Sequence, residues 1–165
     1  MARRRTEPTS LDQRRSRQGK TMLLCGIINE LESASDSGLL SFFCCQATDT
    51  SINNATAVLR GLIYLLVDQQ PSLLSHVRKK YDATGNPLFR SVNIWVALSE
   101  IFTGILEDLT LPPTCLIIDA LDERIEGLDL LLGLVVQASS IYTNVKWIVS
   151  SRNWPIIEKK LDATT

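Results

Sequence analysis

The sequence predicts an α/β protein in which helices flank a parallel sheet. Three short runs, residues 39–46, 115–119 and 145–150, have the length of strands. The first is continuously apolar, as in a strand that is covered on both faces, and the second also has the character of a buried strand. Longer stretches with apolar residues at helical spacing separate these runs. Strands that alternate with helices in this way form layered structures around a parallel sheet.

Helices are expected before, between and after the strands. Asn53 is expected to cap one helix and Pro71 to open another, and Pro112 with Pro113 ends a third. The first helix is apolar on almost every side, so we expect it to be buried. The expected helices cover residues 21–33, 53–66, 71–81, 92–106, 128–139 and 155–161.

Charge is distributed unevenly along the 165 residues. The net charge is −1, but residues 1–20 hold six arginines and Lys20 against Glu7 and Asp12, which leaves about −6 for the remainder. We therefore expect a disordered basic tail over residues 1–18 and one domain over residues 19–165. Hydrophobic residues make up 45% of the chain, enough for one sizeable core.

Two function classes are disfavoured by the composition. The apolar runs are far shorter than a membrane span, and the residues after the N-terminal arginines lack the apolar stretch of a signal peptide. Nucleic-acid binding by the basic tail is also not expected, because Pro8 and the acids interrupt it and no aromatic residue is interleaved. These features predict a cytoplasmic protein without a membrane anchor.

The cysteines and the single histidine have no obvious site. The four cysteines lie in apolar segments without the paired spacing of a zinc site, so we expect them to be reduced and buried. His76, in a basic stretch, is expected to be solvated. The cysteines are Cys25, Cys44, Cys45 and Cys115.

The first motif that indicates a functional site is Gly19-Lys20-Thr21, which has the form of the second half of a P-loop. Lys20 would contact the β- and γ-phosphates of ATP or GTP, and Thr21 would bind Mg²⁺. A helix that starts here would add free N–H groups and a partial positive charge. Such a tripeptide is common, so its meaning depends on the other motifs of the chain.

The second motif is a cluster of acids at the end of the strand expected over residues 115–119. Asp119 would hold the magnesium ion, and Asp122 or Glu123 would orient or deprotonate the attacking water. Ligands bind at the carboxyl ends of strands in open α/β sheets. The alternative is that the acids cap the next element and face solvent, and their position after Gly-Lys-Thr makes this alternative weaker.

The third motif comes directly after the last expected strand. Arg152 would lie at the same edge of the sheet as the acids, where a cation can sense or stabilise a γ-phosphate. An ordinary surface arginine remains the alternative.

These segments, in this order, resemble the NACHT domain of fungal STAND proteins, and residues 57–66 resemble it too. This group includes heterokaryon-incompatibility proteins and nephrocystin-like N-terminal domains. The resemblance implies a P-loop NTPase-like fold of three layers, the site roles given above, and oligomerisation with other NACHT proteins. It also implies that nucleotide binding is coupled to signalling in non-self recognition and programmed cell death. The segments are Gly-Lys-Thr-Met-Leu-Leu (19–24), Leu-Ile-Ile-Asp-Ala-Leu-Asp-Glu (116–123) and Lys-Trp-Ile-Val-Ser-Ser-Arg-Asn-Trp-Pro (146–155).

The chain departs from this family upstream of Lys20. The family's loop looks like G-x-x-G-x-G-K-T, whereas Arg14 and Arg17 stand where two of the glycines are expected. Side chains there obstruct the turn that aims consecutive N–H groups at phosphate. The strand that should precede the loop is also missing, and it would lie beside the strand at residues 145–150. We therefore expect an incomplete domain, truncated at both ends.

Three functions are compatible with these features, in order of preference. The first is a signalling switch that binds ATP or GTP with Mg²⁺ and hydrolyses it weakly or not at all, so that enzymatic activity is left open. The second is a pseudo-NTPase or decoy that binds full-length NACHT proteins without nucleotide, through the unpaired strand edge. The third, a nucleic-acid binder led by the arginine tail, predicts strongly salt-dependent binding.

Overall fold

Three parallel strands form the centre of the computed structural model, which describes residues 10–34, 38–46, 52–84, 94–121 and 125–151. The strands are β1 (Leu39–Cys44), β2 (Thr114–Asp119) and β3 (Val145–Val149), in the order β1-β2-β3. Cys44 is paired with Asp119 and Ile118 with Val149, so the carboxyl ends of the strands share one edge. The predicted strands and their parallel arrangement are confirmed.

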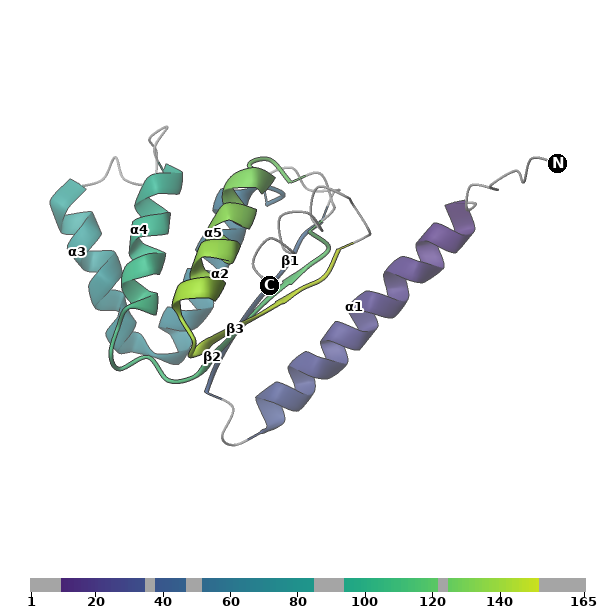
Figure 1. Ribbon diagram of the computed structural model, residues 1–165, viewed down its shortest axis with the longest axis horizontal. Helices are drawn as coiled ribbons and strands as arrows, with labels where there is room; N and C mark the ends of the chain where they lie inside the picture. The colour runs from purple at the N-terminus through teal and green to yellow at the C-terminus, as the bar shows by residue number, and fades with distance from the viewer. Residues whose placement is uncertain (1–9, 35–37, 47–51, 85–93, 122–124, 152–165) are drawn as a thin grey trace.

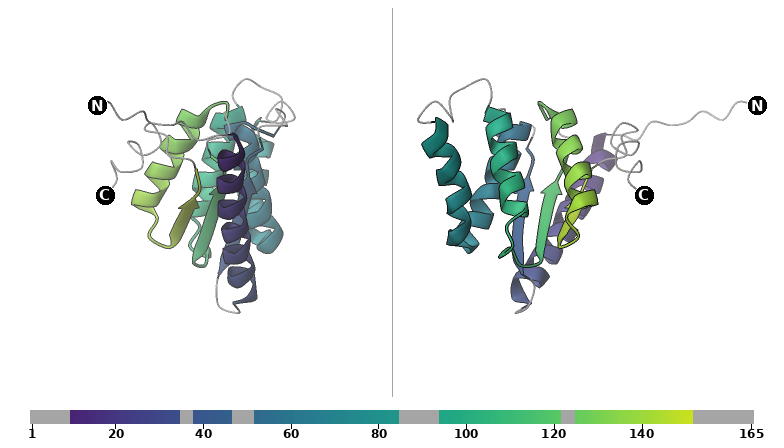
Figure 2. Two further views of the ribbon diagram at one scale, coloured as in Figure 1. Left: turned by 90° about the vertical axis from the view of Figure 1, so that its right-hand side faces the viewer. Right: turned by 60° about the vertical axis from the view of Figure 1, so that its left-hand side comes forward.

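Helices cover both faces of this sheet, as the sequence predicts. Figure 1 shows α1 on one side and α2, α4 and α5 on the other, and Figure 2 shows the same three layers from two other directions. The helices are α1 (Ser10–Ser33), α2 (Ala55–Gln69), α3 (Leu74–Thr84), α4 (Ile94–Leu106) and α5 (Leu128–Ile141), with a 3₁₀ turn, η1, at Pro71–Leu73. The helix expected over residues 155–161 lies outside the described residues.

Local sequence sets the start of α2 one residue later than expected. Asn54, rather than Asn53, caps the helix, and its side chain accepts a hydrogen bond of 2.8 Å from the amide of Ala57. A backbone contact explains why Asn54 is the cap. The Ala55 amide donates a hydrogen bond of 2.8 Å to the Glu126 carbonyl, which fixes the chain at the first residue of α2. Pro71 opens η1 and α3 as predicted.

The larger core lies between the sheet and the layer of α2, α4 and α5. Fully buried Leu59 and Leu62 of α2 meet Phe102 and Ile105 of α4 there. Trp147 of β3 packs edge to face against Phe102, with ring centroids 6.1 Å apart. α2 contributes six buried residues, so this layer is the most firmly attached part of the fold.

The smaller core lies under α1. Leu24 and Ile28 bury their side chains against Leu40 of β1 and Ile117 of β2. Each such side chain contributes about 1.5–3 kcal/mol when fully buried, so two of them attach α1 less firmly than the opposite layer is attached. The expectation that this helix is buried on all sides is wrong, because Met22 and Leu23 are 71% and 66% exposed. In the part of the chain that the structure describes, no element covers the outer face of α1.

The helix also starts earlier than expected. α1 begins at Ser10, so the prediction of a disordered tail over residues 1–18 is wrong for residues 10–18, whereas residues 1–9 lie outside the described part. Residues 11–18 contain neither proline nor glycine, and their arginines and glutamines favour helix. The helix propensity of these residues therefore extends α1 toward the N-terminus, beyond the part that packs against the sheet. No strand precedes β1 among residues 10–34, in line with the missing first strand.

His76 is not simply solvated, as the sequence suggested. Its ring Nε2 lies 2.7 Å from an Asp108 carboxylate oxygen, which ties α3 to the end of α4. Thr110 donates two more hydrogen bonds to this carboxylate, from its amide at 2.8 Å and its hydroxyl at 2.7 Å. The hydrogen bond from His76 first, and those from Thr110 next, lower the pKa of Asp108 from 3.8 to about 2.

This lowered pKa predicts a loss of stability in acid. A carboxylate with a lower pKa in the folded state stabilises that state above its unfolded pKa and loses the effect as pH falls through the folded value. We expect Asp108→Asn to remove that part of the pH dependence between about pH 4 and pH 2. Urea unfolding of both proteins across this range measures the difference, and parallel stability curves would contradict the assignment.

The packing of α2 on β1 generates a second prediction. A Cβ atom on Gly61 would lie 2.5 Å from the ring of Phe43, so the helix approaches the strand too closely for a side chain there. We expect Gly61→Ala to destabilise the fold by roughly 1–3 kcal/mol through overpacking. The matched control is Gly133→Ala in α5, where a Cβ atom meets nothing within 4 Å. Because alanine favours helix, the control should be neutral or stabilised by up to about 1 kcal/mol, and equal denaturation midpoints for the two variants would count against this packing.

Candidate functional site

The candidate site is built around a contact between α1 and the end of β2. The Thr21 hydroxyl donates a hydrogen bond of 2.9 Å to a carboxylate oxygen of Asp119, across 98 positions of sequence. Asp119 is only 4% exposed, whereas Thr21 is open to solvent. The two residues that the sequence nominates as magnesium ligands therefore lie together, with the hydroxyl on the solvent side of a buried acid.

The chain turns sharply just beyond this acid. Ala120 has φ 56°, in the left-handed region that residues with a side chain seldom adopt, at a cost of about 1–2 kcal/mol. The turn carries Leu121 into the core and lets its amide donate to the Ser150 carbonyl at 2.9 Å. The ends of β2 and β3 are thereby joined beside Asp119. Sequence reasoning missed this strained residue, because an alanine carries no signal for a left-handed backbone.

Lys20 reaches the same edge of the sheet. Its Nζ donates a hydrogen bond of 2.7 Å to the carbonyl of Ser151, just beyond β3. Lys20 is exposed, so its ammonium group is accessible to an anion. Lys20, Thr21 and Asp119 thus lie at the carboxyl end of the sheet, which is the edge where α/β proteins bind ligands.

Three of the predicted site residues lie outside the described residues. These are Asp122 and Glu123, which come after the turn at Ala120, and Arg152, which comes after Ser151. Their predicted roles toward water and the γ-phosphate stay predictions. The residue that precedes each gap, Leu121 or Ser151, is held at the edge where the site lies.

Gly19 does not form part of a phosphate loop in this structure. The expectation that a helix begins at Gly-Lys-Thr is wrong, because α1 starts at Ser10 and these residues lie in its interior. The first four N–H groups of a helix are the ones left free, and here they belong to residues far before Lys20. A Cβ atom on Gly19 would meet nothing within 4 Å, so nothing in this conformation requires a glycine. The site has the lysine, the hydroxyl and the acid of a P-loop protein without the backbone cradle.

Two cysteines border the site, and the expectation that all four are buried is wrong. Cys25 and Cys44 are exposed, Cys115 is half-buried, and only Cys45 is buried. Burial raises the pKa of the Cys44 thiol, and the nearby Asp119 carboxylate and Cys25 thiol raise it further. The register of β1 and β2 could have predicted that Cys44 lies beside the site, because Cys44 is the residue paired with Asp119.

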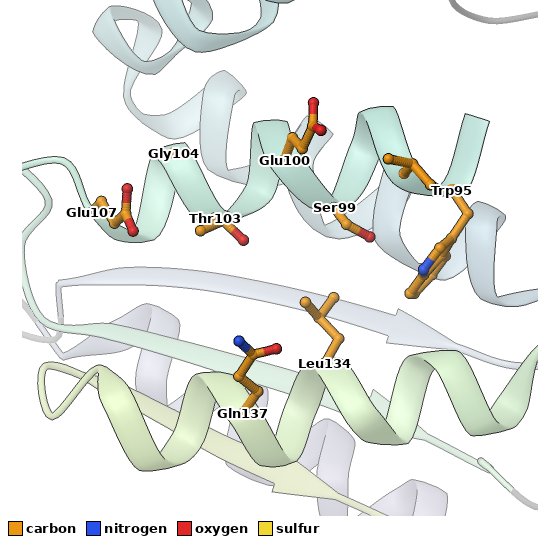
Figure 3. A pocket seen from close by; sticks show the side chains of 9 residues that line it. Trp95, Ser99, Glu100, Thr103, Gly104, Glu107, Leu134 and Gln137 are labelled. Carbon is orange, nitrogen blue, oxygen red and sulfur yellow. The ribbon is translucent and has the colours of Figure 1, made fainter. Parts of the chain in front are cut away.

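A groove of about 400 Å³ lies away from this site, between α4 and α5 in the layer opposite α1. Figure 3 shows Leu134 and Gln137 pointing from α5 toward α4. The groove contains none of the residues that the motifs nominate. The lining residues are Trp95, Val96, Ser99, Glu100, Thr103, Gly104, Glu107, Leu134 and Gln137.

A domain of three layers whose parallel sheet brings a Gly-Lys-Thr helix against an acid at a strand end is a P-loop NTPase-like domain. A model of the nephrocystin 3 N-terminal family matches residues 15–152, and the chain belongs to this family. The vegetative incompatibility protein HET-E-1 of Podospora anserina is 61% identical over 148 residues. This confirms the resemblance drawn from the sequence.

The similarity to HET-E-1 covers 90% of this chain but only 11% of that protein. No solved structure matches the chain. In addition, none of the helices among the described residues has the length and apolar character needed to cross a membrane.

Proposed function

We propose that this chain is the nucleotide-binding part of a signalling switch and takes a nucleoside triphosphate, ATP or GTP, with Mg²⁺. The observation that carries the proposal is the Thr21–Asp119 hydrogen bond of 2.9 Å. It brings a hydroxyl and a buried carboxylate together beside an exposed lysine at a strand end, although the two residues are 98 positions apart in the sequence. By its resemblance to the NACHT domains of fungal STAND proteins, the switch would act in fungal non-self recognition and cell death, by oligomerisation with other NACHT proteins.

The oxygen atoms of the site suit Mg²⁺. This ion is commonly bound by one or two protein oxygens together with substrate phosphates and water, and the Thr21 hydroxyl and Asp119 carboxylate provide such a pair. In the described part of the chain, no three acids, cysteines or histidines gather into a metal site of their own. The phosphates therefore would complete the coordination. When bound, the ion would neutralise phosphate charge.

Other residues of the chain would contact the phosphates and the attacking water. Lys20 would leave the Ser151 carbonyl and pair with the β- and γ-phosphates, because a phosphate oxygen is a stronger partner than a neutral carbonyl. Asp122 or Glu123 would orient the attacking water, and Arg152 would contact the γ-phosphate. Because the interior of α1 leaves no N–H groups free near Gly19, we propose that binding is weak and that hydrolysis is weak or absent.

The role of Lys20 can be tested by calorimetry. We expect Lys20→Ala to weaken MgATP or MgGTP binding by about tenfold or more, because a charge-assisted hydrogen bond contributes about 1.5–3 kcal/mol. Lys79→Ala is the matched control, since Lys79 is an exposed lysine on α3 in the opposite layer. Equal binding heats for the wild type and Lys20→Ala would rule out a phosphate-binding role for this lysine.

The absence of free N–H groups near Gly19 predicts that restoring glycines before it increases the affinity for nucleotide. Replacing both Arg14 and Arg17 by glycine should favour unwinding of α1 before Gly19, since each glycine costs about 1 kcal/mol of helix stability relative to alanine. We expect MgATP to bind roughly threefold or more tightly, with a loss of helical circular dichroism. The control is the double change to alanine, which removes the same charges but keeps the helix. Tighter binding by the alanine protein would show that arginine charge, rather than backbone geometry, limits affinity.

A second candidate function is a module that binds full-length NACHT proteins without nucleotide. The observation that favours it is the open edge of β3, which within the described residues pairs only with β2. The backbone groups of Trp147 and Val149 face that edge, because alternate residues of a parallel strand bond to opposite neighbours. The exposed Met22 and Leu23 lie on the neighbouring layer, so a partner could cover both.

This second candidate is separated from the first by a pull-down with full-length HET-E-1. The decoy function predicts association of equal strength with and without ATP, and weaker association for Leu23→Asp. Leu109→Asp is the matched control, because Leu109 is fully exposed between α4 and β2. Association that requires ATP, or no association at all, would count against the decoy.

A further inference from the structure

Two exposed cysteines, Cys25 of α1 and Cys44 of β1, lie near the smaller core and the Asp119 carboxylate. Leu40 and Phe42 of β1 pack against α1, and side chains two positions apart on a strand share a face. Cys44 is the next residue of this set, so it lies on the face that α1 covers. Cys45, one position later, belongs to the core on the opposite face.

Cys25 occupies the matching place on α1. It lies four residues after Thr21 and therefore on the same side of the helix. Thr21 touches Asp119, and Asp119 is paired in register with Cys44, so both thiols lie beside the same carboxylate. α1 and β1 also approach closely, with Cα atoms within 8 Å of one another. The electrostatic influence of Cys25 and Asp119 on Cys44 agrees with this placement.

Accessibility separates this pair from the other cysteines. Cys25 and Cys44 are both exposed, whereas Cys115 is half-buried between α1 and the sheet and Cys45 is buried. An oxidant in solution can therefore reach the first two thiols directly. A crosslink between them would close a loop of about 20 residues, a length for which a disulfide gives a clear stabilisation in the chain-entropy account.

We propose that Cys25 and Cys44 form a reversible disulfide that fastens α1 to β1 beside the Thr21–Asp119 contact. This inference goes beyond the proposed function and holds whether or not the site binds nucleotide. α1 is attached to the sheet by fewer buried side chains than the opposite layer, so a covalent bond here would stabilise the most weakly packed layer of the fold. The chain would then carry a redox-dependent modification site at the edge of its candidate phosphate site.

Glutathione disulfide is an oxidant of the required class. One cysteine thiolate attacks its sulfur–sulfur bond, forming a mixed disulfide and releasing one glutathione thiolate. The second cysteine thiolate attacks the protein sulfur of this mixed disulfide and releases the second glutathione. The two protein thiols lose two electrons and two protons in total, and glutathione disulfide is reduced to two glutathione thiols.

The test uses the full chain without nucleotide, equilibrated with glutathione disulfide and then denatured under acid. We expect the mass to fall by about 2 Da, and the number of titratable thiols to drop from four to two. Protease cleavage after Glu30 and Glu32 separates Cys25 from Cys44, so the crosslinked peptides stay together until a reductant is added. The oxidised protein should also melt higher by on the order of 5 °C.

Single variants identify the partners. Cys25→Ser and Cys44→Ser should each abolish the crosslink, and both are exposed positions at which serine is tolerated. Cys115→Ser should retain it. Four free thiols after oxidation, a stable glutathione adduct without a crosslink, or a crosslink that survives in Cys44→Ser would each overturn the proposal. Because no nucleotide is present, these outcomes are independent of the Lys20 experiment.

Discussion

The hydrogen bond between Thr21 and Asp119 links the parts of the chain on which the proposed function depends. It holds the middle of α1 against the carboxyl edge of the sheet, where the turn at Ala120 joins β2 to the end of β3. A buried carboxylate needs a partner, because burying an uncompensated charge is costly. In this structure the partner is the Thr21 hydroxyl, and under the proposed function Mg²⁺ would bind to the same acid.

Much of the fold can be predicted from periodicity. The three apolar runs became parallel strands, and α2 through α5 lie close to the predicted ranges, because buried strands and amphipathic helices carry their burial pattern in sequence. The pairing of Gly-Lys-Thr with Asp119 was predictable for a related reason. The order of the two motifs resembles that of P-loop proteins, and ligands of open α/β sheets bind at the carboxyl ends of the strands, where Asp119 lies.

The remaining features depend on context that a sequence pattern does not carry. The start of α1 was missed because continuous helix propensity over residues 10–18 outweighed the expected break at the phosphate motif. The exposure of Cys25 and Cys44 depends on where α1 lies over the sheet, and the His76–Asp108 contact joins the ends of two helices. Asn54 replaced Asn53 as a cap because the Glu126 carbonyl fixes the chain there.

The most direct test of the central claim asks whether Asp119 binds a nucleotide-bound divalent ion. Mn²⁺ replaces Mg²⁺ at oxygen-ligand sites, and its effect on the relaxation of water protons changes when a Mn²⁺–ATP complex binds to a protein. We predict that the wild-type chain enhances this relaxation and that Asp119→Asn does not. The same enhancement for both proteins, or none for either, would contradict a site built on Thr21 and Asp119.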